Sequence, residues 1–382
     1  MNASLNRAAA LGRLGVAMML HDKPKLCGTL LGVVFAVILV NQQGGTFLGI
    51  LAKNRMLIDH ANADLWIVPR GARQLQTTRT LGDSALRQAR GAPGVGWAEP
   101  LLLGPAAISL PAGGSELVTL VGTRLPRLAG GPWNLVAGGT GSLSEPDTIV
   151  VEDSQREKLG GLDLGSVREL EGRRVRVGAL TWGLVPFEPP YAFAELELGR
   201  SALRLPRDRQ TFVLVGLAPG ADPDAVRAEL RRRLPEADVH TAAGLAEVVT
   251  DFLLASTPLG VTFGSATALG LIVGVVVVSL SMLSAVLDNL REFGTLKAIG
   301  ATTADLAVLL VAQSVAYALA GSLLGLAAVT QVARGIRSAQ LVVHLPGWLV
   351  GATVLVMIAV CVGSSTLALL RLRKLEPGAV FR

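Results

Sequence analysis

The sequence predicts an α-helical integral membrane protein with four transmembrane helices and a large mixed α/β extracytoplasmic domain, inserted between the first and second helices. Three observations lead to this fold class. Four long runs contain no Asp, Glu, Lys or Arg, a central segment of balanced charge separates the first run from the second, and basic residues flank the runs. With 51% hydrophobic residues, the chain is more apolar than most soluble globular proteins.

Each charge-free run is long enough to cross a bilayer. The runs are residues 26–52, 252–287, 306–333 and 338–370, and a hydrocarbon core of about 30 Å requires roughly 20 helical residues. A buried helix in a soluble core could explain one run, but four such runs favour a membrane bundle. The first run is too long for a cleavable signal peptide, and no small-residue cleavage site follows it.

The distribution of charge predicts the topology. Residues 53–251 contain 23 Lys and Arg against 24 Asp and Glu, whereas the rest of the chain contains 12 against 5, a net charge of +7. These basic residues cluster before the first run, between the second and third, and after the fourth. The positive-inside bias then places both termini and the 290–301 segment in the cytoplasm, and the central segment outside. The basic charge thus indicates membrane topology and predicts no nucleic-acid partner.

The predicted elements follow in order along the chain. Residues 1–25 form a cytoplasmic N-terminal segment, for which an interfacial helix is expected and a disordered basic leader is the alternative. The others are transmembrane helix 1 with its stalk (26–51), the extracytoplasmic domain (52–255), transmembrane helix 2 (256–288), a cytoplasmic segment (289–303), transmembrane helix 3 (304–332), a short extracytoplasmic loop (333–345), transmembrane helix 4 (346–370) and a cytoplasmic tail (371–382).

Short β-rich pieces alternate with Gly/Pro turns in the extracytoplasmic domain. The predicted strands are "ADLWIVP", "ELVTLVG", "DTIVVE", "RRVRVGAL" and "TFVLVGLA", and the predicted helices are "DSALRQAR" and "DPDAVRAELRRRL". The strand "ADVHT" after the second helix suggests a β-α-β unit built on "TFVLVGL". Two subdomains are expected, with the Gly/Pro-rich region 129–147 as the candidate boundary. Both cysteines, Cys27 and Cys361, fall in predicted spans, so this domain is expected to lack disulfides.

Several kinds of chemistry have no sequence signal. The chain contains no G-x-x-x-x-G-K-[ST] phosphate loop, and its four histidines lack metal-ligand spacing. His240 follows Asp238 by two residues, which strand alternation explains more simply than a metal site. The four runs lack the carboxylates and strong bases that ion-coupled transporters and intramembrane hydrolases require. The sequence therefore predicts no catalytic residue, metal or cofactor bound by this chain.

Each span contains two glycines four residues apart, which share a helix face and allow close helix packing, either within the chain or against a second copy. The pairs are Gly28/Gly32, Gly270/Gly274, Gly321/Gly325 and Gly347/Gly351.

A polar segment, "LREFGTLKAIGA" at 290–301, lies between the second and third spans. Its apolar residues recur every third position and predict a short helix with an apolar ridge, while Gly300 follows as a helix stop. Thr302 to Asp305 has the spacing of a capping box that opens the third span. Such a helix would offer polar side chains to another protein in the cytoplasm, and a solvated loop is the alternative.

These residues resemble a family signature. "LREFGTLKAIGATTADL" is similar to the segment after the second span of MacB/FtsX-type (type VII) ABC transporter permeases, with its Arg-Glu-[apolar]-Gly-[polar]-Leu-[Lys/Arg]-Ala-[apolar]-Gly-Ala pattern. The resemblance covers the whole chain, including the closing "LRKLEPGAVFR". "TIVVEDSQREKLG" and "ADLWIVP" look most like the DevC-like subgroup.

The resemblance implies that the polar segment contacts a separate ABC ATPase, on which ATP and Mg would be bound. The residues matching the pattern are the charged Arg291, Glu292 and Lys297, the glycines Gly294 and Gly300, and the apolar Phe293, Leu296 and Ile299. One position departs from the pattern, because Gln313 stands where relatives often carry Glu.

The implied protein is a homodimeric permease of the bacterial cytoplasmic membrane. It would pass motion to its extracytoplasmic domain and export a lipid-like or amphipathic cargo with a periplasmic adaptor and an outer-membrane channel, surrounded by membrane lipids. The alternative is an FtsX-like mechanotransmission subunit that activates an extracytoplasmic partner without transport. An ATP-independent receptor is a third interpretation, but it leaves the polar segment unexplained.

Overall fold

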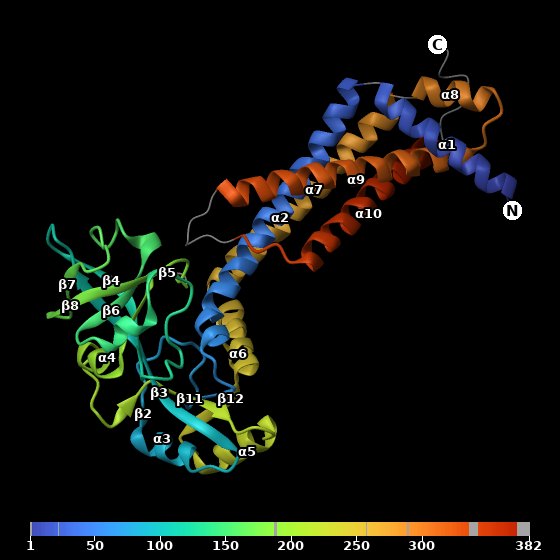
Figure 1. Ribbon diagram of the computed structural model, residues 1–382. Coiled ribbons are helices and arrows are strands. Elements are labelled where there is room, and N and C mark those ends of the chain that lie inside the picture. The colour runs from blue at the N-terminus through green and yellow to red at the C-terminus, as the bar shows by residue number, and fades with distance from the viewer. Residues whose placement is uncertain are drawn as a thin grey trace. The chain divides into compact units, whose positions relative to one another are not determined.

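The computed structural model describes residues 2–21, 23–186, 189–256, 258–288, 290–335 and 343–372 (Figure 1). The chain forms two compact units. The membrane unit comprises Met1–Leu48, Val261–Arg337 and Val343–Arg382, and the outer unit comprises Gly49–Gly260 and Ser338–Val342. Among the described residues, four helices are long and apolar enough to span a membrane, at Leu26–His60, Gly260–Ser281, Thr303–Ala333 and Gly347–Thr366. These four helices and the mixed α/β domain after the first confirm the predicted fold class.

The described helices of the membrane unit are, in chain order, α1 (Asn2–His21), α2 (Lys23–His60), α7 (Pro258–Asp288), α8 (Leu290–Ala298), α9 (Thr303–Gly335) and α10 (Gly347–Leu372). Within the N-terminal segment, residues 2–21 form helix α1, and the position of this helix at a membrane interface stays a prediction. Helix α1 packs on α9, where the Gln313 side-chain amide donates a hydrogen bond of 2.9 Å to the Gly15 carbonyl. Helices α1 and α8 lie at the same end of this unit (Figure 1).

The observed helix limits differ from the predicted ones most clearly at α2. This helix continues to His60 instead of ending at residue 51. The charged residues after Leu51 end the hydropathy signal without ending the helix, because Arg55 pairs with Asp59 one turn later at 2.9 Å and Leu57 is fully buried. The predicted loop 333–345 and tail 371–382 fall largely on 336–342 and 373–382, which lie outside the described residues.

Several glycines pack α2 against α7 and α9. A Cβ at Gly321 would lie 2.5 Å from Val33 Cγ1, one at Gly325 would lie 2.8 Å from Val37 Cβ, and one at Gly274 would lie 2.9 Å from Ala36 Cβ. Gly32 faces Ser281 on α7, and Gly270 only approaches Leu39. The other three glycines of the predicted pairs have open space around them: Gly28, Gly347 and Gly351.

The outer unit is built on one large mixed sheet. Its strands are β1 (Leu65–Pro69), β3 (Val95–Ser109), β4 (Ser115–Thr123), β5 (Leu135–Gly138), β6 (Thr148–Glu152), β7 (Val167–Leu170), β8 (Arg173–Thr181), β9 (Tyr191–Glu195), β11 (Phe212–Leu217) and β12 (Ala237–Thr241). The order is β12-β1-β11-β3-β4-β9-β6-β8-β5, and β7 pairs with both β3 and β8. Strands β3, β4, β9, β6, β8 and β7 therefore form a closed ring around an apolar cluster that includes Ile108, Leu120 and Val151.

Short elements complete the outer unit. The helices are α3 (Asp83–Arg90), α4 (Leu196–Ala202), α5 (Pro223–Arg233) and α6 (Ala242–Ser256), with single turns η1 (Thr140–Ser144) and η2 (Asp153–Gln155) and a small pairing of β2 (Leu81–Gly82) with β10 (Arg209–Gln210). The predicted β-α-β unit is present as β11, α5 and β12, but β1 lies between the two strands and runs antiparallel to both.

The long strand β3 joins the two halves of this domain. The first half is built on β12, β1, β11 and the start of β3, and the second half is the ring. Residues 95–101 of β3 pair with β11, and residues 102–109 pair with β4. The expected boundary at 129–147 is wrong, because the sheet continues through β3 and 129–147 lies beside the ring. The sequence hides β3 because Pro100, Gly104 and Pro105 interrupt its pattern.

One apolar cluster covers a face of both halves. It contains Leu57 and Ile58 of α2, Leu245 of α6, Trp66 and Phe212 of the first half, and Val150, Ala179 and Phe193 of the ring. Helices α3 and α5 cover the opposite face of the first half, with Leu86 and Leu230 in a separate cluster (Figure 1). The end of α2 is thus part of the core of the outer domain.

We expect Gly321→Val to destabilise the membrane unit by roughly 1–3 kcal/mol, because the added side chain overlaps Val33. Unfolding of the purified protein in mixed detergent micelles would measure this loss. Gly351→Val is the matched control, since nothing lies within 4 Å of that position, and equal losses in both variants would contradict the assigned packing.

Candidate functional site

The segment predicted to couple to a partner is a helix followed by a tight turn. Helix α8 carries Arg291, Glu292, Phe293, Gly294, Leu296 and Lys297, and Ile299 and Gly300 follow its end. Glu292, Thr295 and Lys297 have exposed side chains. The Thr295 hydroxyl donates to the Glu292 carbonyl at 2.7 Å, so this hydroxyl is used within the helix. The charged side chains of Glu292 and Lys297 therefore face solvent.

The residues of the predicted apolar ridge do not share one packed face, because the helix ends before Ile299. Leu296 is half-buried and packs with Met18 and Leu283 against a cluster of Leu306, Leu309 and Leu310. Ile299 instead is 82% exposed. Its position at the helix end carries its side chain off the packed face, which the three-residue spacing did not predict. An exposed isoleucine beside Lys297 gives this surface an apolar contact point of the kind found at protein interfaces.

The turn after α8 is fixed by backbone hydrogen bonds. Gly300 has φ of 101°, the Gly300 amide donates to Lys297 at 3.2 Å, and the Ala301 amide donates to Leu296 at 3.0 Å. These bonds form a Schellman motif, in which the residue with positive φ is usually glycine. The predicted helix stop at Gly300 is therefore confirmed.

The next helix starts two residues later with the predicted capping box. The Thr302 hydroxyl donates a hydrogen bond to the Asp305 carboxylate. The Asp305 amide donates to Thr302 Oγ1 at 3.2 Å, and the Thr302 amide donates to Asp305 Oδ2 at 2.9 Å. Helix α8 is thus joined to α9 by a turn with little freedom.

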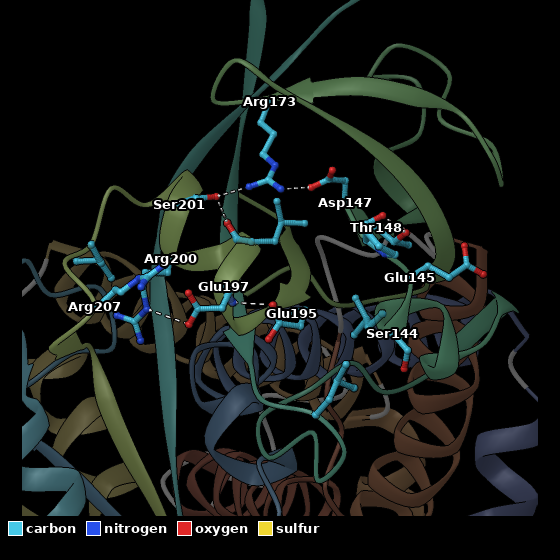
Figure 2. A pocket seen from close by; sticks show the side chains of 15 residues that line it. Ser144, Glu145, Asp147, Thr148, Arg173, Glu195, Glu197, Arg200, Ser201 and Arg207 are labelled. Carbon is cyan, nitrogen blue, oxygen red and sulfur yellow. Dashed lines mark hydrogen bonds and ion pairs between the residues drawn. The ribbon is translucent and has the colours of Figure 1, made fainter.

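The outer unit contains a pocket of about 670 Å³ at the start of α4 (Figure 2). Its walls bring Arg173, Arg200 and Arg207 together with Glu145, Asp147, Glu195 and Glu197. Arg173 pairs with Asp147 at 2.6 Å, Arg176 with Glu145, and the buried Arg200 with Glu197 at 3.5 Å. Most of these charges are compensated within the pocket wall. The sequence did not indicate this pocket, because its residues come from four separate segments.

Among the described residues, no group of three or more His, Cys, Asp and Glu could hold a metal ion. His240 lies on β12 opposite Trp66, in the alternating pattern of the strand. Partial burial lowers the pKa of its imidazole below the usual 6.5; Asp238 acts in the opposite direction, and Arg231 and Arg227 reinforce the lowering. This histidine is a structural residue of the sheet.

Two family descriptions match the sequence. Residues 27–233 match the MacB-like periplasmic core domain, and residues 264–377 match the FtsX-like permease C-terminal domain. The first match alone covers more than half of the chain. An uncharacterized ABC transporter permease of Methanocaldococcus jannaschii is 31% identical over 124 residues, which are 31% of this chain and 30% of that protein.

Solved extracytoplasmic domains show further similarity. The extracellular domain of the noncanonic ABC-type transporter YknZ from Gram-positive bacteria is 14% identical, with a TM-score of 0.35 over 47% of this chain and 98% of that one. The periplasmic region of MacB from Actinobacillus actinomycetemcomitans is 11% identical, with a TM-score of 0.38 over 50% of this chain and 93% of that one. The family assignment rests on the sequence matches alone.

We expect Gly300→Ala to loosen the turn after α8, because an L-residue is strained at a φ of 101°. Hydrogen exchange of the Ile299, Gly300 and Ala301 amides, measured by mass spectrometry, should become faster. Gly347→Ala is the control, since that glycine begins a helix and has open space around it; unchanged exchange in Gly300→Ala would show that the Schellman bonds do not fix the turn.

The outer unit should lose stability as the pH falls through 6.5. Unfolded His240 binds a proton more readily than folded His240, so acid favours unfolding until the pH passes below the lowered pKa of the folded state. Thermal unfolding followed by circular dichroism between pH 5 and 8 would measure the slope. His240→Gln should flatten it, and an unchanged slope in that variant would assign the effect to other groups.

Proposed function

Because this chain belongs to the MacB/FtsX-type ABC transporter permeases, we propose that it is the membrane subunit through which a separate ATPase drives an export machine. The family match makes the chain an ABC transporter permease and a membrane protein. In our proposal, ATP and Mg bind to the partner ATPase, since this chain has no phosphate-binding loop.

The α8 surface supports the contact with an ATPase. Its exposed charges, Glu292 and Lys297, and the exposed Ile299 form a small surface in front of a fixed turn. Behind the surface, Leu296 packs against the leucine cluster at the start of α9, and Met18 of α1 packs against the same cluster. A push on α8 would therefore reach two further helices through packed side chains. In the proposed topology this end of the membrane unit, and both termini, lie in the cytoplasm of a bacterial cell.

Helix α2 supports the transmission of motion. It is packed against α7 and α9 in the membrane unit, and its last turns belong to the core of the outer domain. Movement of the spans would thus reach the sheet through buried contacts and not through a flexible linker. This is the single observation that carries the proposal.

The assembly we propose is a homodimer with two ATPase subunits. Helix α7 exposes many large apolar side chains, among them Val261 (72%), Leu269 (62%) and Leu280 (61%), which suit contact with lipid or with a second copy. A periplasmic adaptor, an outer-membrane channel and a lipid-like or amphipathic cargo, as in DevC-like relatives, complete the proposal. The FtsX-like alternative keeps the same transmission and replaces the cargo with an extracytoplasmic enzyme to be activated.

Glu292→Lys should reduce the amount of ATPase that co-purifies with the tagged protein from native membranes, because it reverses an exposed charge of the α8 surface. Mass spectrometry after gentle solubilisation would identify and quantify the partners. Glu157→Lys, the same change on the exposed surface of the outer unit, should leave the ATPase yield unchanged. Co-purification of an adaptor would support export, that of a cell-wall hydrolase would support the FtsX-like alternative, and the absence of any ATPase would refute both.

A further inference from the structure

A lysine of α2 is buried in the outer domain. Lys53 lies two turns before the end of the helix, and only 8% of it is exposed. Its Nζ donates a hydrogen bond to the carbonyl oxygen of Gly183, in the loop after β8. Burial lowers the pKa of the Lys53 ammonium group, and the negative charge of Glu152 at the end of β6 acts in the opposite direction. Lysine is rarely buried to this extent, and when it is, it has a charged or polar partner.

The partner carboxylate is held by hydrogen bonds from four groups. Glu152 is 1% exposed and accepts from the Gly183 amide at 2.6 Å, the Leu184 amide at 2.9 Å, the Thr181 hydroxyl at 3.1 Å and the Ser154 hydroxyl at 2.6 Å. Its negative charge is therefore fixed in place, and so is the loop that it holds.

The Gly183 loop connects the carboxylate to the lysine. The amide of Gly183 bonds to Glu152 and its carbonyl bonds to Lys53, while its φ of 86° is one that glycine adopts without strain. The loop is also tied to the neighbouring chain, because the Trp182 amide donates to the Asn134 carbonyl at 3.1 Å. Lys53 thus binds a rigid part of the ring of strands.

Lys53 belongs to a stripe of contacts along α2. Ile50, Lys53, Leu57 and Ala61 are all buried and recur at helical spacing. At the end of the stripe, the Ala61 carbonyl accepts from the Gly130 amide at 3.1 Å, and the His60 ring stacks on Trp133 with centroids 4.6 Å apart. The apolar side chains of this stripe hold α2 by close packing, whereas the Lys53 and Ala61 contacts are hydrogen bonds and depend on direction as well as on distance.

Stability alone does not account for a buried pair of charges. Removing two charges from water costs free energy that their attraction often fails to recover, and a well-packed apolar pair of similar size is often as stable. What the Lys53 contact supplies is a single preferred position, because a shift of α2 would separate the buried ammonium group from the Gly183 carbonyl, whereas Glu152 would keep its four hydrogen bonds.

We propose that Lys53 and Glu152 are positioning residues that fix α2 to the β6–β8 strands, so that movement of α2 is passed to the ring of the outer domain. This inference rests on the proposed function, in which α2 is moved by the ATPase. Neither residue contacts a cargo or ATP in this role; both act through the Gly183 loop.

The test measures movement and assembly separately. Spin labels at the exposed positions Val261 and Glu157 report the distance between the membrane unit and the ring, with and without a non-hydrolysable ATP analogue, in the complex with its ATPase. Labelled protein is diluted with unlabelled protein so that distances within one chain dominate. ATPase co-purification and thermal unfolding are measured on the same samples.

The decisive variant is the double substitution Lys53→Met with Glu152→Gln, which removes both charges and leaves none unpaired. We expect ATPase yield and thermal stability close to those of the wild type, together with loss of the nucleotide-dependent change in distance. Arg55→Met is the matched control on the same helix, because Arg55 is exposed and pairs with Asp59 on the next turn of α2; it should keep the change.

Lys53→Arg provides the second variant, since it retains the charge and should retain at least part of the movement. A double variant that is folded, binds the ATPase and still shows the full change in distance would overturn the assignment of Lys53 and Glu152. A wild-type protein that binds no ATPase, or shows no change with nucleotide, would instead refute the proposed function on which the inference depends.

Discussion

Burial of helix α2 at both ends is the constraint on which the rest of the structure depends. In the membrane unit its Val33, Ala36 and Val37 are packed against glycines of α7 and α9, where no side chain separates the helices. In the outer unit its Leu57 and Ile58 complete an apolar cluster that also contains Trp66, Phe193 and Phe212. Neither contact can be lost without exposing large apolar side chains or opening a cavity. One helix therefore belongs to the cores of two units.

The α8 segment of the membrane unit is also fixed by apolar packing and hydrogen bonds. The turn from α8 to α9 is held by two backbone bonds at Gly300 and Ala301 and by the reciprocal bonds of Thr302 and Asp305. Leu296 anchors the helix, while Glu292, Lys297 and Ile299 are left to solvent. A surface that is held from behind and exposes Glu292, Lys297 and Ile299 suits the proposed contact with an ATPase. Most of its hydrogen bonds join residues close together in the chain, so this segment can be predicted from the sequence.

Polar groups inside the apolar unit are used for packing between helices. The Gln313 side-chain amide donates a hydrogen bond to the Gly15 carbonyl of α1. Ser364 and Ser279 bond each other between α10 and α7 at 2.8 Å. In a low-dielectric environment a neutral amide or hydroxyl costs less to bury than an ion, and it still selects one helix register. The neutral Gln313 thus supports α1 as a packed element of the bundle.

The sequence by itself determined the features that depend on neighbouring residues. Charge-free runs predicted the four spans, Gly300 and the Thr302–Asp305 box predicted the limits of α8 and α9, and short β-rich pieces between Gly/Pro turns predicted β1, β4, β6, β8 and β11. Only the tertiary structure decided the rest. Strand β3 is extended despite its prolines because β11 and β4 pair with it, and β1 enters between β11 and β12 from far along the chain. The contact of Lys53 with Gly183 joins residues separated by 130 positions, and no local pattern records a pairing whose free energy arises only when distant segments are buried together.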